Sequence, residues 1–404
     1  MVTTRTRDYG SGDDEDEIGE HRNASVREEK LADKRNRWAA LLREKLYLTV
    51  INEVLEEELG KYTNNRVFNE ANLMLITREC MLILASAPRI FEAAVEGMLA
   101  LRFTVDQELQ AEYEEIRQRA DVQPSIYMHL LADEGGVAPS ASQYMIIRDI
   151  VTRYIDEAEV QLASLVDNIS PPYVALRDTS AGYRKYLCTA RRSPRRVRVL
   201  ERFCEGIRKR WEETPPQERD LPLNYPPGEC GYAINAPRRL LQHRSRISSN
   251  YIMNLVEDIC TLGFRDLKLF THLFRMHQFI IYLIFNPQQV EVAEMFCSGL
   301  LQVWVDKGGG FNHYPAGLSN ASARRVSEDE WNGHEIYVRE NSPLETNIRH
   351  QRDTIDDVVL KLHEQAAALL WEVFQELAQY EGSEESESDE TENELRRMDM
   401  DINM

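Results

Sequence analysis

The spacing of apolar residues predicts helices over most of the first half of the chain. Apolar side chains recur at steps of three and four positions from about residue 26, with charged residues between them, as in an amphipathic helix. The pattern returns over 67–85, 107–118 and 140–166, and connections containing glycine, proline or asparagine separate these segments. We therefore expect residues 26–168 to form an all-α bundle of antiparallel helices.

Beyond a Ser-Pro-Pro boundary the pattern changes to alternating strands and helices. The run 279–285 is β-branched and aromatic throughout, which is typical of a buried strand. Helical patterns precede and follow it, over about 237–260 and 288–305. We expect a small mixed α/β module over 171–345. A C-terminal helix over 346–380 completes a fold of the α+β class.

The two ends of the chain have no apolar periodicity and are strongly acidic. Residues 1–22 hold seven acidic and three basic side chains, and residues 381–404 hold ten acidic and two basic ones. These ends supply more than half of the formal net charge of -20. Such segments bury too little apolar surface to offset the entropy of ordering them, so we expect disordered tails over 1–25 and 381–404.

The body of the chain contains one strongly basic block. Residues 184–210 include eleven basic and two acidic side chains, and we interpret this block as an insertion in the α/β module. A block of this kind is suited to the phosphates of DNA or RNA, although a charged helix face neutralised by the acidic tails is an equal alternative. The predicted phosphate-binding residues are Arg191, Arg192, Arg195, Arg196 and Arg198.

Targeting and redox signals indicate an intracellular protein. No apolar segment follows Met1, and the longest uninterrupted apolar run, 279–285, is too short to span a membrane. The six cysteines are widely spaced and include no Cys-x-x-Cys pair, which argues against a zinc finger and favours free thiols. We expect a location in the nucleus or the cytoplasm and no association with a membrane.

One segment of the second half places two cations on the same face of a predicted helix. Gly231 follows a strand-like stretch, Asn235 is suited to cap a helix, and Arg239 and His243 then lie four residues apart. An arginine in this position can hold a phosphate through two hydrogen bonds. A surface helix with ordinary solvated charges is the alternative interpretation.

This pattern resembles the GIY-YIG nuclease family, in which a signature strand ending in glycine precedes a helix that presents Arg-Leu and then His. Gly231, Asn235, Arg239, Leu240 and His243 fall in the matching places. The resemblance covers about residues 173–312.

Two later residues extend the resemblance. Glu294, on a predicted helix, matches the metal-binding glutamate of the family, and Asn312, after three glycines, matches its late asparagine. The first signature strand is placed at Tyr173, which requires the basic insertion before Gly231. The chain departs from the family at Glu229, which stands where the second signature tyrosine is expected.

The resemblance implies hydrolysis of phosphodiester bonds with Mg²⁺ as the cofactor. Glu294 would hold the metal ion, and Arg239 would stabilise charge that develops on the phosphate. Tyr173 or Tyr232 would help to deprotonate the attacking water, and His243 would orient it. Asn312 would contact the substrate.

We therefore expect a nucleic-acid-binding protein with a divergent or degenerate Mg²⁺-dependent endonuclease module, and a protein partner for the helical bundle. The alternative is a non-enzymatic intracellular protein that acts as an interaction partner or scaffold. In that case the basic block would contact partners or the acidic tails of the same chain.

Overall fold

The computed structural model describes residues 29–62, 65–69, 72–171, 184–188, 192–247, 249–317, 321–356, 361, 365–366 and 368–371. The two predicted tails, Tyr173 with its predicted strand, and Arg191 lie outside the described residues. The described residues up to Glu345 belong to one compact unit, and those from Thr346 belong to a second.

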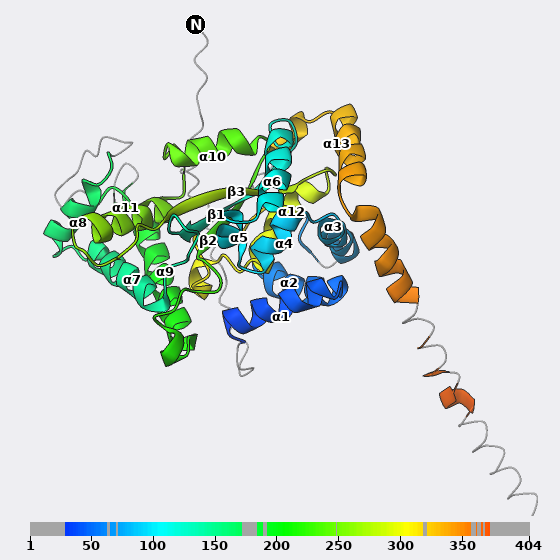
Figure 1. Cartoon of the computed structure of the whole chain (residues 1–404), viewed down its shortest axis with the longest axis horizontal. Helices are drawn as coiled ribbons and strands as arrows, with labels where there is room; N and C mark the ends of the chain where they lie inside the picture. Colours follow the sequence, from blue (N-terminus) through cyan, green and yellow to red (C-terminus); the bar gives the residue numbers. More distant parts are fainter. Residues whose placement is uncertain are drawn as a thin grey trace, which may run out of the picture. The chain divides into compact units, whose positions relative to one another are not determined.

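Within the described residues, three strands form one antiparallel sheet in the order β2-β1-β3 (Figure 1). The strands are β1 (Ser125–Ala132), β2 (Gly228–Ala233) and β3 (Arg275–Leu283). The central strand β1 pairs with both neighbours along most of its length. Helices account for most of the remaining regular structure, so the α+β fold class is confirmed.

The expectation of an all-helical first half is wrong in one respect that decides the architecture. Strand β1 lies inside 26–168, and it pairs with strands that follow the predicted boundary, so the sheet joins both halves in one unit. All eight residues of β1 are buried. A strand buried on both faces shows no alternation of apolar and polar residues, and a short apolar run of this kind cannot be told from a buried helical segment.

The helices before β1 lie together on one part of the sheet (Figure 1). Helices α2 and α3 pack against α12, and α4 and α6 pack against β3. The long helix expected from residue 26 is interrupted at Lys45, whose φ of 59° is left-handed. The helices are α1 (Leu31–Arg43), α2 (Tyr47–Leu59), α3 (Leu73–Ala85), α4 (Arg89–Val95), α5 (Leu99–Phe103) and α6 (Gln107–Arg119).

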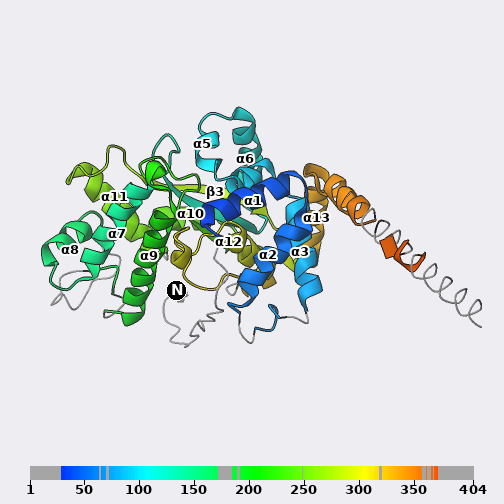
Figure 2. The same ribbon diagram turned by 90° about the horizontal axis from the view of Figure 1, so that it is seen from below.

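A second group of helices surrounds a separate part of the core (Figure 2). Helix α7 packs against α9, and α11 packs against both α7 and α8. The predicted basic insertion, 184–210, includes most of α9, which is amphipathic and buries Leu200, Phe203 and Ile207 in this core. The helices are α7 (Ala141–Ile155), α8 (Val160–Asp167), α9 (Pro194–Glu213) and α11 (Tyr251–Arg265).

Three further helices complete the first unit. Helix α10 (Ala236–Arg244) packs on β1 and β2, and α12 (Gln289–Leu300) packs on β2. The helix predicted over 237–260 is divided into α10 and α11, and Arg246 between them has a left-handed φ of 58°. Helix α13 (Glu328–Asn341) begins with a capping box at Ser327.

The described residues within the predicted C-terminal helix are helical over 346–356, at 361, and at 365–366 and 368–371. In the described part of the chain, no helix combines the length and the apolar character that crossing a membrane requires.

Candidate functional site

One face of the sheet carries a group of ionisable side chains from neighbouring strands. Side chains alternate between the two faces of a strand, so Tyr127 and His129 of β1 share a face. In the antiparallel register Tyr127 lies opposite Gly231, and His129 lies opposite Glu229. These positions bring the hydroxyl, imidazole and carboxylate groups together on the face that α10 covers.

The tyrosine ring occupies the space that a side chain at position 231 would fill. A Cβ atom on Gly231 would lie 2.5 Å from the Tyr127 hydroxyl oxygen and 2.6 Å from Cζ. Contacts this short are essentially never seen, so a side chain at position 231 would require Tyr127 or the strand to shift. The glycine of the predicted motif therefore makes room for Tyr127, a residue that the sequence analysis did not select.

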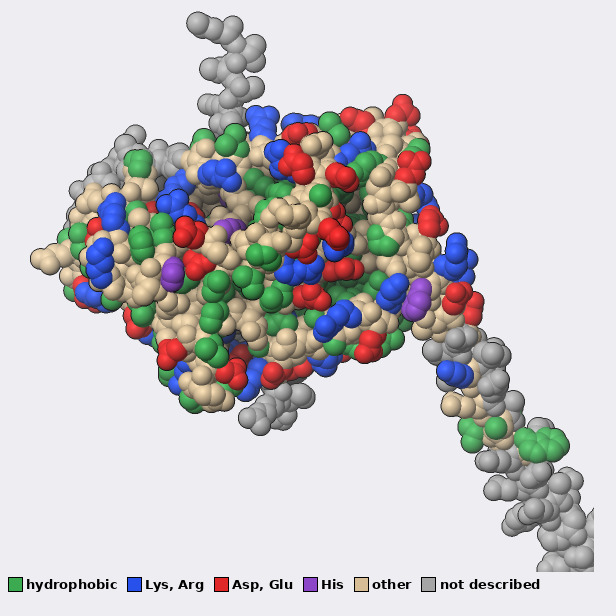
Figure 3. Space-filling model, in the orientation of Figure 1, with side chains coloured by type: hydrophobic (Ala, Val, Ile, Leu, Met, Phe, Trp, Pro, Cys, Tyr) green, Lys and Arg blue, Asp and Glu red, His purple; other side chains and the backbone are tan. Residues whose placement is uncertain are grey.

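Helix α10 covers this face and begins with the capping residues expected from its sequence. The Asn235 side chain accepts the backbone N–H of Arg238 at 2.9 Å, and Pro237 occupies the first turn. His243 Nε2 lies 3.1 Å from the Tyr127 hydroxyl, and the positive charge of Arg239 acts to lower the pKa of the same tyrosine. The surface in Figure 3 is hollowed near the position of α10, and a histidine side chain is visible there with Lys and Arg side chains around it.

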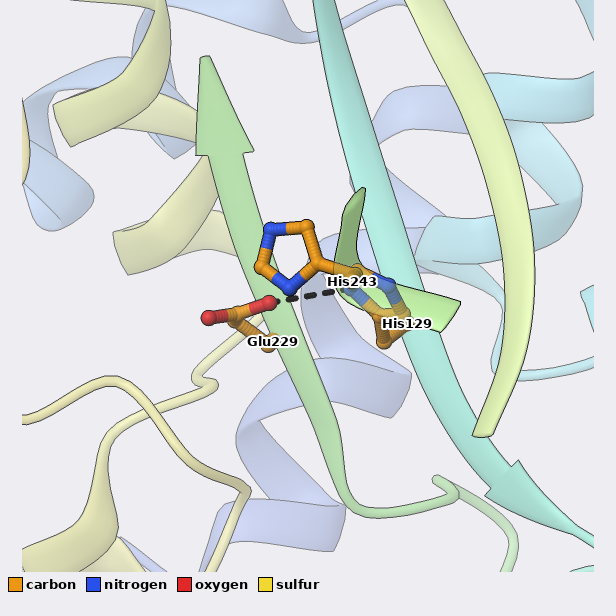
Figure 4. Close-up of side chains that lie close together, drawn as sticks. All are labelled: His129, Glu229 and His243. Atoms are coloured by element: carbon orange, nitrogen blue, oxygen red, sulfur yellow. Dashed lines mark ion pairs between the residues drawn. The ribbon is translucent and has the colours of Figure 1, made fainter. Parts of the chain in front are cut away.

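His129, Glu229 and His243 form a compact cluster contributed by β1, β2 and α10 (Figure 4). One ligand atom from each residue lies within 4.8 Å of the other two. His129 Nδ1 is 2.9 Å from Glu229 Oε2, and the two imidazole centroids are 4.7 Å apart. His129 is only 1% exposed and His243 only 6%, so these three residues are the described group best able to hold a metal ion.

Burial and mutual contact shift the pKa values of Glu229 and His243. Burial opposes ionisation of Glu229, but the hydrogen bond from His129 and the charges of the two histidines outweigh it and lower the pKa of Glu229 to about 2. Burial lowers the pKa of His243 to about 3, although Glu229 opposes this shift. At neutral pH the cluster therefore contains a carboxylate beside a neutral His243.

Glu294 approaches the same region from α12. Its Oε2 accepts the backbone N–H of Gly317 at 2.9 Å. Burial, reinforced by the charge of Glu229, raises the pKa of Glu294 to about 7, whereas Arg239 acts in the opposite direction. The charges of Arg239 and Glu229 thus act on the Glu294 carboxylate in opposite directions.

Asn312 has a structural role instead of the expected contact with substrate. Its side chain accepts the Cys230 N–H at 3.1 Å and donates to the Cys230 carbonyl at 2.9 Å. Strand β2 is an edge strand, and these two bonds pair backbone groups on its outer side. The asparagine is only 8% exposed, so its amide is committed to holding β2 in place.

Tyr232 lies on the other face of β2 from Gly231, as its odd spacing requires. Burial raises the pKa of its hydroxyl, which has no hydrogen-bond partner among the described residues. The catalytic role predicted for Tyr232 is therefore not supported by its position, because Tyr127 is the tyrosine next to Arg239 and His243.

The described arginines of the basic block divide into two groups. Arg192 donates to the carbonyl of Ile155, and Arg196 donates to that of Cys188 and packs over Tyr251, so both hold the fold together. Arg195 and Arg198 are exposed. The Arg195 guanidinium lies over the ring of Tyr314, 4.5 Å from its centroid.

Tyr127 and His129 are the site residues that the sequence analysis missed. The available signal was the spacing of two positions in Tyr127-Met128-His129, which puts both side chains on one face if the segment is a strand. That signal was hidden because the segment was assigned to a helical bundle. In comparisons with protein-family models, curated proteins and solved structures, nothing matches this chain.

Proposed function

We propose that this protein cleaves phosphodiester bonds of a nucleic acid at a site that resembles that of the GIY-YIG nucleases. The observation that carries the proposal is the convergence of Tyr127, Arg239 and His243 on one sheet face, with Gly231 directly opposite the tyrosine. In this proposal Ser125-Ile126-Tyr127 takes the place of the first signature, which the sequence analysis put at Tyr173.

Each of the three residues has a part in the proposed reaction. The Tyr127 oxygen receives the proton of the attacking water, because Arg239 and the Nε2–H of His243 stabilise that oxygen as a phenolate. Arg239 also stabilises the negative charge that develops on the phosphate. Burial raises the pKa of Tyr127 above its ordinary value, so the phenolate is the scarce, reactive form.

The Glu294 carboxylate fits Mg²⁺, the cofactor that the resemblance implies. An ionised carboxylate offers about four acceptor sites. The backbone N–H of Gly317 uses one of them, which leaves acceptor sites for a cation. Mg²⁺ favours oxygen ligands and is bound through few carboxylates, with water and phosphate completing its shell. When bound, it would supply positive charge to the phosphate.

A cleavage assay tests the proposal. Supercoiled DNA, single-stranded DNA and RNA are incubated with the full chain in Mg²⁺ and in EDTA. We expect Mg²⁺-dependent strand cleavage that Arg239→Ala lowers by about 10²–10³-fold, the size of effect seen when one charge-stabilising group is lost. Glu294→Gln keeps an acceptor for the Gly317 N–H but removes the negative charge that would bind Mg²⁺. We expect this variant to lose the Mg²⁺-dependent cleavage.

The adjacent Arg238 provides the matched control. It lies on the same helix but is exposed, so Arg238→Ala should retain nearly full cleavage. Equal activity of Arg239→Ala and the wild-type protein on every substrate would refute the assigned role. Absence of cleavage by folded wild-type protein on all three substrates would refute the proposed activity.

Two exposed arginines of α9 are proposed to contact the nucleic acid as well. Arg195 and Arg198 are exposed near the start of α9, and the charge of Arg195 reaches His313. Charge reversal at both positions should weaken binding. It should also make the slope of log affinity against log salt concentration shallower, by about the amount that two phosphate contacts contribute. An unchanged slope would place the nucleic acid elsewhere.

A second candidate, a non-enzymatic interaction protein, is favoured by one surface feature. Leu73, Met74 and Leu75 at the start of α3 are all exposed, and Met74 is 88% exposed. A cluster of exposed apolar side chains is typical of protein contact sites. If this function holds, the wild-type protein should capture a protein partner without cleaving nucleic acid, and Met74→Gln should abolish that capture.

A further inference from the structure

In the cluster of His129, Glu229 and His243, a buried histidine nitrogen without a hydrogen-bond partner lies beside a buried ion pair. Among the described residues, His129 Nδ1, Glu229 Oε2 and His243 Nδ1 are buried and have no hydrogen-bond partner apart from the 2.9 Å contact of the first two. Leaving buried polar atoms unsatisfied costs free energy, and each such atom in a native structure calls for an explanation. All three belong to the group whose ligand atoms lie within 4.8 Å of one another.

We propose that these three residues bind a Zn²⁺ ion. Two imidazole nitrogens and one carboxylate oxygen form a donor set that suits Zn²⁺, which binds nitrogen at about 2.0–2.1 Å and carboxylate oxygen at about 2.0–2.2 Å. The candidate ligand atoms already lie within 4.8 Å of one another, and a bound ion would draw them closer. Three protein ligands leave a fourth position for water or substrate.

The surroundings of His243 favour a metal at its Nδ1. The Tyr127 hydroxyl lies 3.1 Å from the other ring nitrogen, Nε2, and its oxygen can accept a hydrogen bond from Nε2–H. A metal-bound histidine usually donates its second N–H to an oxygen, which fixes the tautomer and the ring orientation. Tyr127 thus supplies the outer hydrogen bond, and the unpartnered Nδ1 of His243 faces the cluster (Figure 4).

Zn²⁺ binding by His129 requires the neighbouring Gln278 amide to change its orientation. Gln278 Nε2 lies 3.2 Å from His129 Nε2, and it also donates to the carbonyl of Leu240 at 3.1 Å. Zn²⁺ at Nδ1 places the proton of His129 on Nε2, so the Gln278 amide must turn to present its oxygen. A carboxylate at position 278 would accept this N–H without turning.

The proposed Zn²⁺ site goes beyond the proposed nuclease function, because it uses different ligands and does not depend on cleavage. The Mg²⁺ proposal rests on Glu294, an oxygen ligand on α12, whereas the Zn²⁺ ligands come from β1, β2 and α10. Nitrogen ligands select transition metals over Mg²⁺. Glu294→Gln should therefore leave Zn²⁺ binding intact, so that failure of one proposal is distinguishable from failure of the other.

Direct metal binding tests the inference on the full chain. Metal-free protein is titrated with Zn²⁺ by calorimetry and with Co²⁺ by visible absorption, with Mg²⁺ as the comparison ion. We expect one Zn²⁺ per chain, a Co²⁺ spectrum with the ligand-field bands of a low-symmetry site, and displacement of Co²⁺ by Zn²⁺. Excess Mg²⁺ should displace neither ion.

Single substitutions identify the ligands. Glu229→Gln keeps the size of the side chain, and we expect it and His243→Gln each to weaken Zn²⁺ binding by more than about 100-fold, the upper end of effects at outer-shell positions. Gln278→Glu should strengthen binding by roughly 10-fold through the N–H of His129. His272→Gln is the control, because His272 is an exposed histidine outside the cluster.

The outcomes separate a metal site from a buried hydrogen-bonded cluster. If folded wild-type protein binds neither Zn²⁺ nor Co²⁺, or if the Glu229 and His243 variants bind both ions as tightly as the wild-type protein does, the inference is overturned. Where a ligand variant fails to fold, Gln278→Glu and the thermal stability of wild-type protein with and without Zn²⁺ decide the question. Zn²⁺ must then raise the unfolding temperature, and it must raise that of Gln278→Glu further.

Discussion

Tyr127 lies directly opposite Gly231 on the neighbouring strand, and its hydroxyl occupies the space where a side chain at 231 would begin. The added Cβ of Gly231→Ala would be 2.5 Å from that hydroxyl oxygen. We expect this variant to lose about 1–3 kcal/mol of stability, as overpacked interiors do, and to move Tyr127 away from His243. Chemical denaturation and the cleavage assay measure the two effects.

Gly333→Ala is the matched control for this substitution. Gly333 lies within α13, and an added Cβ would meet nothing within 4 Å. Alanine is favoured over glycine in helices by about 0.5–1 kcal/mol, so this variant should be slightly more stable than wild type. Similar stability changes in the two variants would contradict the steric role assigned to Gly231.

The position of Tyr127 beside Arg239 and His243 predicts a characteristic pH dependence. Because burial holds the pKa of Tyr127 above its ordinary value of 10.0, the reactive phenolate grows with pH, and cleavage should rise steadily from neutral to alkaline pH. Tyr127→Phe removes the proton acceptor and should reduce the rate by about 10²–10⁴-fold. Rates of purified variants across that pH range provide the measurement.

Tyr232→Phe supplies the comparison for this prediction. Tyr232 is also on a strand of the sheet, but its side chain lies on the other face of β2. Its removal should change the rate only slightly and should keep the alkaline rise. A larger loss in Tyr232→Phe than in Tyr127→Phe would return the catalytic role to the tyrosine that the sequence analysis selected.

The sequence predicted the local elements of the site better than its assembly. Helix α10 with its Asn235 cap and strand β3 over much of 279–285 follow from patterns that a few neighbouring residues determine. The pairing of β1 with β2 depends on residues about 100 positions apart, which local patterns do not encode. Tyr127 and His129 could therefore not be connected with His243 until the central strand was identified.

Asn312 shows a different limit of sequence analysis. Its position after three glycines fits a functional loop residue, yet its amide pairs the backbone of Cys230 on the edge of the sheet. Pattern and spacing do not distinguish an amide that contacts a ligand from one that completes an edge strand. Only the position of the loop relative to β2 makes that distinction.

This structural role of Asn312 predicts a loss of stability when its amide is removed. Asn312→Ala leaves the N–H and the carbonyl of Cys230 without partners in the interior, and each orphaned group costs about 1–3 kcal/mol. Asn341→Ala removes an exposed amide that donates only to the Tyr337 carbonyl, and it should have a much smaller effect. Equal unfolding midpoints for the two variants would contradict the edge-strand role.

A buried ion network supports the connection between α10 and α11. Asp258 of α11 is fully buried and forms ion pairs with Arg246 at 2.7 Å and with Lys185 at 3.0 Å. Arg246 is the left-handed residue at which the two helices separate. The network therefore ties the end of the site helix to the neighbouring core.

Breaking this network should be costly and should alter the acid stability of the protein. Asp258→Asn leaves two cations without their carboxylate, and loss of one partner of a buried ion pair costs about 3–5 kcal/mol. Burial opposes ionisation of Asp258, but Arg246, Tyr186 and Ser170 outweigh it and hold the pKa below its ordinary value of 3.8. A carboxylate with a depressed pKa contributes stability above its unfolded-state pKa and loses it as the pH falls through the folded-state value.

The free energy of unfolding measured from pH 7 down to pH 2 tests this reasoning. The wild-type protein should lose more stability below pH 3.8 than Asp258→Asn does, because the variant has already lost the contribution. Asp266→Asn breaks an exposed pair with Arg265, and pairs of that kind contribute at most about 1 kcal/mol. If Asp258→Asn and Asp266→Asn have the same free energy of unfolding at pH 7 and lose it equally as the pH falls, the buried network does not hold the two helices in place.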